Sequence, residues 1–413
     1  MKRAALAVVL GGLVAALGLP ASASDWARSA VVAQRAPSSQ PQLDDLTLPL
    51  VPPWVHRLGT GFVDQAGAAV YLRGFDANSE MAYRKAGDLG ANFVRVAIYW
   101  SDLEPTPPTN GVHNWDAGQI AKLDAEVQYL ANRKVNVLLD LHQSGWSPYF
   151  TNITKDARGM PAWLYSPGYF PQPMSQEGLG LAKKDFATNP AIFPYYRDFA
   201  QLIVDRYRGF ANVVGYELYN EPQPGKLGSN HTGTQTLIAF QGKLLQYLRT
   251  LDPLRTYVVF TRQGGDLGYL NADISAWAPT VDVALDFHDY FVGLDPPYGL
   301  SDDTERWSPD TQSTHTQFEA AYVGTYANQL RLLDQVLAKT NEWGIPLIVG
   351  EWGARYDDPG LLEYQRQMLN ALRARKLSWA RWALTSHGSL RILDNGKPTA
   401  AALQIQQDLL NPY

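Results

Sequence analysis

The stretch VVGYELYNEPQPG, residues 213–225, places a carboxamide and a carboxylate where a buried strand has to end. Residues 213–219 have the apolar and aromatic character of such a strand. Pro222 has no N–H to donate to a neighbouring strand, so we expect the strand to stop close to it. Asn220 and Glu221 are therefore predicted at the C-terminal end of a strand, where the chain turns into a loop.

Eight short runs of this apolar, β-branched kind are spread along the chain. The candidate strands are Val70–Gly74, Asn92–Ile98, Val135–Leu141, Val213–Tyr219, Thr256–Phe260, Val283–His288, Pro346–Gly350 and Ser378–Ala383. Most are separated by stretches with helical spacing of apolar residues, namely Asp116–Arg133 behind an aspartate cap, Tyr195–Tyr207, Gln235–Leu251, Tyr322–Trp343, Leu361–Arg373 and Thr399–Leu410. The helical pattern after the fifth strand is weak. A short hairpin at Gly61–Tyr71, turning at residues 65–67, is expected to close the bottom of the fold.

Eight buried strands separated by helices predict an all-parallel sheet. In one domain of this length they predict an α/β fold, a single (β/α)8 TIM barrel with long loops at its C-terminal face. A doubly wound open sheet is the alternative. A dinucleotide-binding sheet of that kind would carry a glycine-rich turn after its first strand, and residues 73–75, Arg-Gly-Phe, do not form one.

In such a barrel the chemistry is carried by the C-terminal ends of the strands. Polar or aromatic residues stand there on six of the eight strands: Arg95 on the second, Asp140 and His142 on the third, Asn220 and Glu221 on the fourth, His288 and Tyr290 on the sixth, Glu351 and Trp352 on the seventh, and Trp382 on the eighth. Taken singly, the arginine could be a structural ion-pair partner and the histidines hydrogen-bonded core residues. We assign Asp140 a structural role. The joint pattern favours a shared functional site at the C-terminal ends of these strands.

Two of these residues, Glu221 and Glu351, end strands that can face each other across the barrel mouth. Retaining glycoside hydrolysis needs two carboxyl groups about 5–5.5 Å apart, one as acid/base and one as nucleophile. The acid has to hold its proton, so we expect a raised pKa for it, while the nucleophile has to stay ionised. Arg95 and Tyr290 are suited to the second task, and Asn220 to hydrogen bonding with the sugar 2-hydroxyl. His142 and His288 can donate to hydroxyls or tune the carboxylates, and Trp382 offers a flat face for a sugar ring.

In this ordered set the chain resembles glycoside hydrolase family 5, a family of retaining barrel enzymes. The family pattern reads here as Arg95, His142, Asn220-Glu221, His288 with Tyr290, Glu351 and Trp382, and the resemblance implies Glu221 as acid/base and Glu351 as nucleophile. Within the family, LLDLHQSGWSPYF followed by GMPAWL is most similar to the endoglycoceramidase branch, which cuts the β-linkage between an oligosaccharide and ceramide. That branch typically adds a β-sandwich after the barrel, and this sequence ends at Tyr413. LSWARWALTSHGS is similar to bacterial endoglucanases, so an endo-β-1,4-glucanase or mannanase stays open as an alternative.

Two long insertions are predicted to flank the site. Ser144–Ile192 is rich in aromatic residues and is expected to form a wall of the substrate cleft, with a self-packed surface loop as the alternative. Trp146 and Trp163 from this insertion, together with Trp352, are candidate subsite aromatics. Gly293–Phe318 is the second insertion and is expected to form the opposite wall.

Other classes of site are disfavoured by composition. The sequence has no cysteine, which excludes disulfides, cysteine nucleophiles and thiolate metal sites. Single histidines without a His-x-His pair argue against a metal-dependent hydrolase, and no Gly-x-Ser-x-Gly elbow is present for a serine hydrolase. We expect no metal and no cofactor. The formal net charge of −5, with no basic block, argues against a nucleic-acid partner. A non-catalytic carbohydrate-binding barrel remains the alternative of another class.

The beginning of the chain predicts export. A basic start precedes an apolar run at residues 4–19 and a small-x-small cleavage signal at residues 21–23. The run is shorter than the roughly 20 residues that span a bilayer, so we expect a cleaved signal peptide at 1–23, a secreted product, and no integral membrane segment in the mature chain. A flexible Pro/Ser-rich lead-in is predicted at 24–53 and the catalytic barrel at 54–413, as a monomer acting on a carbohydrate or glycolipid.

Overall fold

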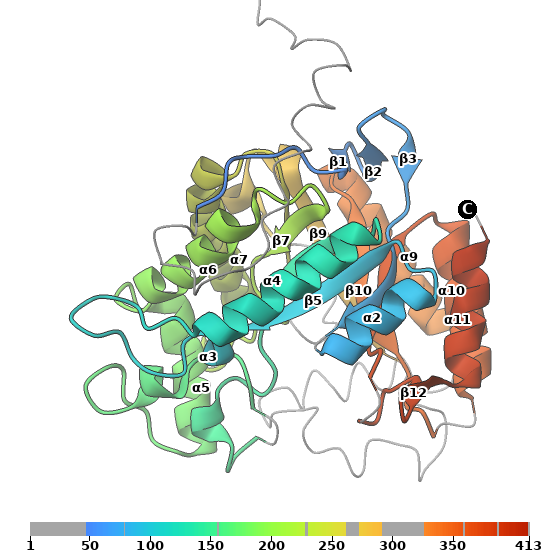
Figure 1. Ribbon diagram of the computed structural model, residues 1–413. Helices are drawn as coiled ribbons and strands as arrows, with labels where there is room; N and C mark the ends of the chain where they lie inside the picture. Colours follow the sequence, from blue (N-terminus) through green and yellow to red (C-terminus); the bar gives the residue numbers. More distant parts are fainter. Residues whose placement is uncertain are drawn as a thin grey trace, which may run out of the picture. The chain divides into compact units, whose positions relative to one another are not determined.

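Eight parallel strands close into a barrel in the computed structural model, which describes residues 47–77, 79–154, 157–227, 230–261, 272–290, 326–357, 360–385 and 388–411 (Figure 1). The barrel strands are β4 (Arg73–Ala77), β5 (Phe93–Tyr99), β6 (Asn136–His142), β7 (Val213–Glu217), β8 (Thr256–Val259), β9 (Val283–Tyr290), β10 (Leu347–Gly353) and β11 (Ser378–Arg381). Each pairs with the next in chain order, and β11 closes on β4. The predicted (β/α)8 barrel is confirmed.

The hairpin before the barrel corrects one strand boundary. The strand predicted at Val70–Gly74 starts too early, because Val70 pairs in β3 (Ala69–Val70) and the barrel strand begins at Arg73. Strands β2 (Gly61–Asp64) and β3 form the predicted hairpin. Asp64 Oδ1 accepts hydrogen bonds from the N–H groups of two residues in its turn. A third strand, β1 (Val55–Leu58), pairs with β2 and was not predicted.

The helices cover the outside of the barrel (Figure 1). They are α2 (Glu80–Asp88), α3 (Trp100–Leu103), α4 (Ala117–Asn132), α5 (Gln176–Thr188), α6 (Phe193–Tyr207), α7 (Asn230–Leu251), α9 (Tyr326–Trp343), α10 (Leu361–Ala374) and α11 (Ala400–Leu410). The predicted aspartate cap of α4 is present, because the Asp116 side chain accepts from the Gln119 N–H. The weak pattern after the fifth strand corresponds, within residues 272–282, only to the short 3-10 turns η5 (Ser275–Trp277) and η6 (Thr280–Asp282).

Side chains inside the barrel lie in tiers, since every second residue of a strand points inward. The lowest tier is apolar and consists of Leu72, Phe93, Leu138, Val214, Val258, Ala284, Ile348 and Ala380. Val55 and Phe62 of the N-terminal sheet pack against this tier, in agreement with the predicted closure of the barrel bottom. Two residues further along their strands, Arg95, Asp140 and Asp286 form part of a charged tier.

Outside the barrel, residues just before β1 are hydrogen-bonded to the end of α6. The Leu48 N–H donates to Asp205 O at 2.9 Å and the Val51 N–H to Arg208 O at 3.1 Å.

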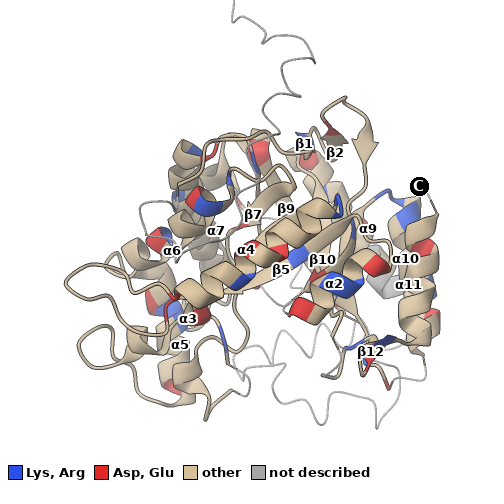
Figure 2. Ribbon diagram, viewed as in Figure 1, with Lys and Arg blue, Asp and Glu red and all other residues tan. Residues whose placement is uncertain are grey.

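The predicted signal peptide, residues 1–23, and the lead-in up to residue 46 lie outside the described residues. Among the residues that the structure does describe, no helix has the length and apolarity to cross a bilayer. Figure 2 shows acidic and basic residues intermixed over the outer helices.

Candidate active site

Glu351 reaches the barrel mouth through an irregularity in β10. Ile348 pairs with Asp286 and Glu351 pairs with His288, so β10 uses three steps where β9 uses two. Such a β-bulge changes which side chains point inward. Ile348 lies in the apolar inner tier and Glu351 contacts Arg95 inside the barrel, whereas Trp352 packs on the outside against Trp379 and Tyr364. The bulge therefore directs the carboxylate, and not the tryptophan, into the site.

Glu221 stands opposite, just beyond β7. One side-chain ligand atom from each of Glu221, His288 and Glu351 lies within 4.8 Å of the others, so a carboxylate oxygen of one glutamate lies within that distance of the other. Retaining glycosidases place their carboxyl groups about 5–5.5 Å apart, and inverting ones about 6.5–9.5 Å. The spacing fits the retaining arrangement.

Glu351 accepts hydrogen bonds from two side chains predicted to support it. Arg95 Nη1 donates to Oε1 at 2.8 Å, and the Tyr290 hydroxyl donates to Oε2 at 2.5 Å. His288 Nδ1 lies 3.3 Å from the same Oε2. The carboxylate is nearly buried, with its side chain 6% exposed, so its orientation is fixed by these contacts. A carboxylate held this way has a fixed orientation and little contact with water, as a nucleophile requires.

Glu221 differs from the expectation in its protonation. His288 Nδ1 lies 2.8 Å from Glu221 Oε1. Burial raises the pKa of Glu221, but the hydrogen bond and charge of His288 outweigh it, and the pKa of Glu221 lies below its usual value. Burial lowers the pKa of His288, but Glu351, Asp286 and Glu221 raise it well above the usual value. The raised pKa predicted for the acid is therefore found on its histidine partner instead.

The backbone at Glu221 has a positive φ of 42°, which is uncommon for a residue other than glycine. Gln143 holds it there, because its Nε2 donates to Glu221 O at 3.1 Å and lies 3.3 Å from Asn220 O. Gln143 is buried and was not singled out from the sequence. Backbone strain of this kind persists only where the surroundings fix it, and it recurs at active sites.

Asn220 is oriented from both ends of its amide. Its Oδ1 accepts from Arg95 Nη2 at 2.7 Å, and its Nδ2 donates to Gln143 O at 3.0 Å and lies 3.3 Å from His142 Nε2. Burial lowers the pKa of His142 to about 3, so its imidazole is neutral and Nε2 can accept. The other ring nitrogen, Nδ1, lies 2.5 Å from Asp140 Oδ2. Asp140 thus positions His142, in line with the structural role assigned to it.

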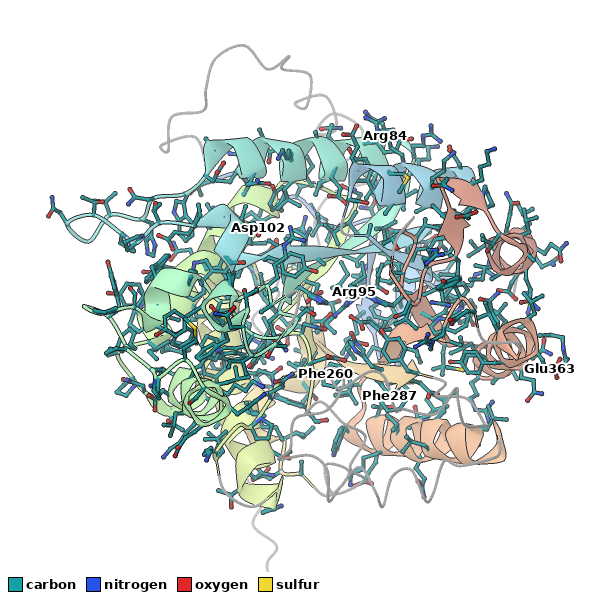
Figure 3. All side chains as sticks on the ribbon, turned by 90° about the horizontal axis from the view of Figure 1, so that it is seen from below. Arg84, Arg95, Asp102, Phe260, Phe287 and Glu363 are labelled. Carbon is teal, nitrogen blue, oxygen red and sulfur yellow. The ribbon has the colours of Figure 1, made fainter. Side chains whose placement is uncertain are left out.

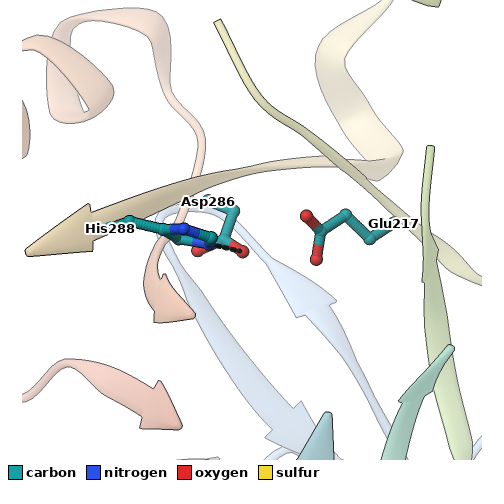
Figure 4. Close-up of side chains that lie close together, drawn as sticks. All are labelled: Glu217, Asp286 and His288. Carbon is teal, nitrogen blue, oxygen red and sulfur yellow. Dashed lines mark ion pairs between the residues drawn. The ribbon is translucent and has the colours of Figure 1, made fainter. Parts of the chain in front are cut away.

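Arg95 is the centre of a buried charge cluster that sequence analysis found only in part. It is fully buried, and Figure 3 labels it in the interior of the barrel. Besides Glu351 and Asp140 it contacts three carboxylates that were missed, Asp76 on β4, Glu217 on β7 and Asp286 on β9. Figure 4 shows Glu217 facing Asp286 and His288 across the barrel. Strand periodicity was the available signal, because Asp286 lies two residues before His288 just as Asp140 lies two before His142.

Among the residues that the structure describes, two sets of side chains have the donor atoms that a metal ion prefers. They are Glu217 with Asp286 and His288, and Glu221 with His288 and Glu351. In the first set the Arg95 guanidinium lies 2.7 Å from Glu217 and 3.5 Å from Asp286, so it already supplies a positive charge there. In the second set His288 Nδ1 is hydrogen-bonded to Glu221 and lies 3.3 Å from Glu351 Oε2. The acidic residues are therefore accounted for by cations of the protein itself.

The candidate aromatic residues differ in exposure, and only Trp382 has an accessible ring. Trp382 is partly exposed, and its ring stacks on His142 with centroids 5.4 Å apart and an interplanar angle of 3°. The three candidate subsite residues Trp146, Trp163 and Trp352 are buried, at most 5% exposed, in contrast to Trp382. Trp146 donates to the Tyr165 hydroxyl within the first insertion, whereas Trp163 donates to Glu104 O and packs on Trp100, both outside the insertion. The second insertion, Gly293–Phe318, lies outside the described residues.

Comparisons with known proteins agree with this geometry. The family model Cellulase (glycosyl hydrolase family 5) matches residues 63–388. A probable mannan endo-1,4-beta-mannosidase F from Emericella nidulans is 26% identical over 205 residues, which are 47% of this chain and 40% of that protein. The chain therefore matches less than half the length of this curated relative.

Solved structures extend the comparison to nearly the whole barrel. An endogalactoceramidase covers 86% of this chain and 84% of its own, with TM-score 0.65 and 19% identity. Endo-glycoceramidase II from Rhodococcus sp., solved as a lactosyl-enzyme intermediate, covers 83% of this chain and 80% of its own, with TM-score 0.63 and 22% identity. At these identities the likeness is one of fold.

Proposed function

This chain belongs to the cellulase family, glycosyl hydrolase family 5, and from that premise we propose that it is a secreted enzyme of endoglycoceramidase type. The family and its glycosidase relatives make the chain a retaining glycoside hydrolase. The β-linked glycolipid substrate, the roles of individual residues and export from the cell form the proposal. The observation that carries the mechanism is the close approach of Glu221 and Glu351 around His288.

The proposed mechanism is a double displacement. Glu351 attacks the anomeric carbon while Glu221 protonates the leaving oxygen, and the glycosidic C–O bond breaks. In the second half Glu221 removes a proton from water, whose oxygen attacks the anomeric carbon and releases Glu351. Arg95 and Tyr290 hold the nucleophile in place, since each donates to one oxygen of its carboxylate. The face of Trp382 not covered by His142 serves the reacting sugar.

The glycolipid part of the proposal rests on the segment after β6. The residues LLDLHQSGWSPYF, 138–150, are similar to the endoglycoceramidase branch, and the two solved structures named above are an endogalactoceramidase and an endo-glycoceramidase. The segment folds against a rigid aromatic cluster, in which Trp146 contacts Phe186 and Tyr165. An internally packed loop beside the site gives an enzyme a fixed wall for an apolar aglycone.

A polysaccharide hydrolase is the second candidate. The relatives that favour it are mannan endo-1,4-beta-mannosidases, which match this chain at 24–26% identity over less than half its length. A polysaccharide needs a long open groove on both sides of the scissile bond, whereas a glycolipid needs sugar subsites on one side only. Product analysis separates the two.

The test compares substrates under identical conditions. The purified chain is incubated with lactosylceramide in detergent, with soluble β-1,4-mannan and with soluble β-1,4-glucan, and the products are separated by chromatography. Release of intact lactose and ceramide supports the proposal. Shortened mannan or glucan with intact lactosylceramide would replace it with the second candidate. The Glu351→Gln variant is the control, because a non-catalytic carbohydrate-binding barrel would behave identically with and without this carboxylate.

Export has a separate support and a separate test. The apolar run at residues 4–19 with the cleavage signal at 21–23 is the observation behind it. N-terminal sequencing of the product recovered from the medium of an expressing host should begin at Ser24. Retention of the uncleaved chain in the cell would contradict export.

A further inference from the structure

Asp286 lies behind the acid/base pair and is fixed by the backbone. Its carboxylate is buried, and Oδ1 accepts from the N–H groups of Phe287 and Gly350, both at 2.7 Å. Gly350 makes room for it, because a Cβ at that position would lie 2.0 Å from Asp286 Oδ2. The residue directly before Glu351 therefore has to be glycine for this carboxylate to occupy its place.

The second oxygen of Asp286 points at His288. Oδ2 lies 3.4 Å from His288 Nε2, the contact drawn dashed in Figure 4, and 3.5 Å from Arg95 Nε. Neither Asp286 Oδ2 nor His288 Nε2 makes any closer hydrogen bond within the described part of the chain. Hydrogen bonds of catalytic groups are often long in the free enzyme and shorten when substrate binds.

The other side of the His288 ring faces both glutamates. Nδ1 lies 2.8 Å from Glu221 Oε1 and 3.3 Å from Glu351 Oε2. Phe260 covers the imidazole edge-on, with centroids 4.7 Å apart. The ring thus connects a buried carboxylate to the carboxylate that meets the substrate, with no room for bulk water between them.

We propose that Asp286 is a positioning residue that keeps His288 doubly protonated, so that the Glu221–His288 pair stores the proton given to the leaving group. This inference rests on the proposed role of Glu221. In the resting enzyme the proton lies on His288 Nδ1 and Glu221 is ionised. As the glycosidic bond breaks, the proton passes to Glu221 and on to the leaving oxygen, and His288 becomes neutral with its Nε2–H directed to Asp286. When water attacks, Glu221 takes its proton and returns it to His288, which restores the starting state.

The surroundings of His288 allow this arrangement. The charged and titratable groups that face or influence it are Asp286 and Tyr290 on its own strand, Glu217 from β7, Glu221 just beyond β7, Glu351 from β10, His142 from β6, and Arg95, Asp76 and Asp140 deeper in the barrel. Carboxylates outnumber the one permanent cation, Arg95, so a second positive charge on the imidazole is favoured. The pKa of His288, well above its usual value despite burial, agrees with this charge count.

The substitution Asp286→Asn tests the proposal sharply. The two backbone N–H groups at 2.7 Å select the amide oxygen for the Oδ1 position, so the amide NH2 would face His288 Nε2. Because two donors cannot face each other, Nε2 has to give up its proton and the imidazole becomes neutral. The pair then loses its proton at lower pH. We expect the basic limb of the kcat/KM profile to move down by about one to three pH units.

Asp76→Asn is the matched control. Asp76 is buried in the same cluster and accepts from Arg95 Nη1 at 2.9 Å, but it makes no hydrogen bond to His288. The same loss of charge there should leave the basic limb closer to its wild-type position than Asp286→Asn does. If both substitutions lower the pH of the basic limb equally, the total charge of the cluster, and not the contact with His288, determines that pH. This result would overturn the proposal.

Leaving-group dependence provides a second readout. A 2,4-dinitrophenyl β-lactoside departs without protonation, whereas an alkyl β-lactoside needs the acid, whose contribution is about 10²–10⁴-fold. Above the displaced limb, Asp286→Asn should lose activity on the alkyl lactoside and retain it on the dinitrophenyl lactoside. A loss of equal size on both substrates and at every pH would mean a purely structural role and would overturn the proposal.

A third readout needs no turnover and separates this inference from the proposed function. NMR of the histidine-labelled full chain, with the His288 signal assigned through His288→Gln, follows the imidazole directly. We expect His288 to stay protonated to higher pH in the wild type than in Asp286→Asn. An unchanged titration would reject the proton store even if the enzyme cleaves glycolipids. A changed titration supports it even if the true substrate is a polysaccharide.

Discussion

Arg95 binds Glu217 through two parallel hydrogen bonds, from Nε to Oε2 at 2.7 Å and from Nη2 to Oε1 at 2.9 Å, and neither side chain has exposed surface. The pair spans the barrel from β5 to β7 directly beneath the two glutamates of the site. The remaining N–H groups of Arg95 donate to Asp76, Asn220 and Glu351. Stability and catalysis therefore depend on the same guanidinium.

Glu217→Gln should destabilise the protein strongly. The amide offers one acceptor oxygen where the carboxylate offered two. Because Arg95 keeps its other carboxylate partners, the cost is that of a buried donor left without its acceptor, about 1–3 kcal/mol. We expect a fall of about that size in the free energy of unfolding, measured by urea denaturation at pH 7. Glu80→Gln, which breaks the exposed pair with Arg84, is the control and should leave the midpoint unchanged. Comparable losses in the two variants would contradict the importance of the buried pair.

Azide should distinguish the two glutamates by stereochemistry. Glu351→Ala removes the nucleophile, so azide attacks a β-configured substrate directly and yields the α-glycosyl azide. Glu221→Ala keeps the nucleophile, so azide opens the glycosyl-enzyme and yields the β-glycosyl azide. With 2,4-dinitrophenyl β-lactoside both variants should be rescued, and the anomeric proton in the NMR spectrum identifies each product. The reverse assignment of the two azides would exchange the proposed roles.

Gly350→Ala should damage the site because its methyl group has no space. The new Cβ would lie 2.0 Å from Asp286 Oδ2 and 2.2 Å from Oδ1. Overpacking of this kind costs about 1–3 kcal/mol, and displacement of Asp286 should also lower kcat. Gly61→Ala is the matched control, since nothing lies within 4 Å of its added Cβ. Thermal unfolding and kcat of both variants check the difference; a Gly350→Ala enzyme as stable and active as the control would refute it.

His113 should make stability depend on pH. Its Nδ1 lies 2.7 Å from Glu104 Oε1 and its Nε2 3.4 Å from Asp198 Oδ2. Burial lowers the pKa of His113, but Asp198 and Glu104 raise it to about 9. Because the folded-state pKa exceeds the unfolded value, the stabilisation is fully present below about pH 6.5 and is lost as the pH rises towards 9.

His113→Gln should therefore remove a pH-dependent part of the stability, about 1–2 kcal/mol after allowance for partial solvent exposure. Urea denaturation of the wild type and the variant at pH 6 and pH 9.5 measures it. The difference between the two proteins should be large at pH 6 and small at pH 9.5. A difference that grows with pH would show that His113 is neutral in the folded protein.

Substitutions of Trp163 and Trp382 should have different effects, the first on stability and the second on substrate binding. Trp163→Phe removes the donor to Glu104 O and leaves a buried carbonyl without it, which costs about 1–3 kcal/mol of folding free energy. Its KM should not change. Trp382→Ala should instead raise KM by up to about tenfold, because an aromatic platform contributes about 0.5–1.5 kcal/mol beyond its area. Thermal unfolding and Michaelis kinetics of both variants decide, and an increased KM for Trp163→Phe would restore it as a subsite residue.

Much of the fold was predictable because barrel strands are buried on both faces and stand out as apolar runs. All eight appear in the predicted order, and the Asp116 cap marks the start of α4. Short, half-exposed elements carry a weaker signal. The strand at Val55–Leu58 has only one fully buried residue, and its pairing with β2 depends on the barrel that it covers.

The site residues at the C-terminal ends of the strands were predictable from the sequence, and the carboxylates buried deeper in the barrel were not. The residues of the family pattern follow strands in an order that chemistry explains, and the structure brings together Arg95, His142, Asn220, Glu221, His288, Tyr290, Glu351 and Trp382. Asp76, Glu217 and Asp286 were missed because each is a carboxylate inside an apolar strand. Its role can be assigned only when its ion-pair partner, Arg95, is known to point into the same barrel. The direction of Trp352 could not be read either, since a bulge of one residue reverses which side of β10 faces inward.

The apolar tier at the N-terminal end of the barrel, covered by Val55 and Phe62, has a consequence for the sequence of chemical events. With that end filled, the departing aglycone and the incoming water have to use the same opening. The glycosylated enzyme therefore waits until the first product has moved aside, and any small alcohol present at that moment meets the same reactive carbon as water does. We therefore expect the enzyme to transfer glycosyl groups to small alcohols as well as to water.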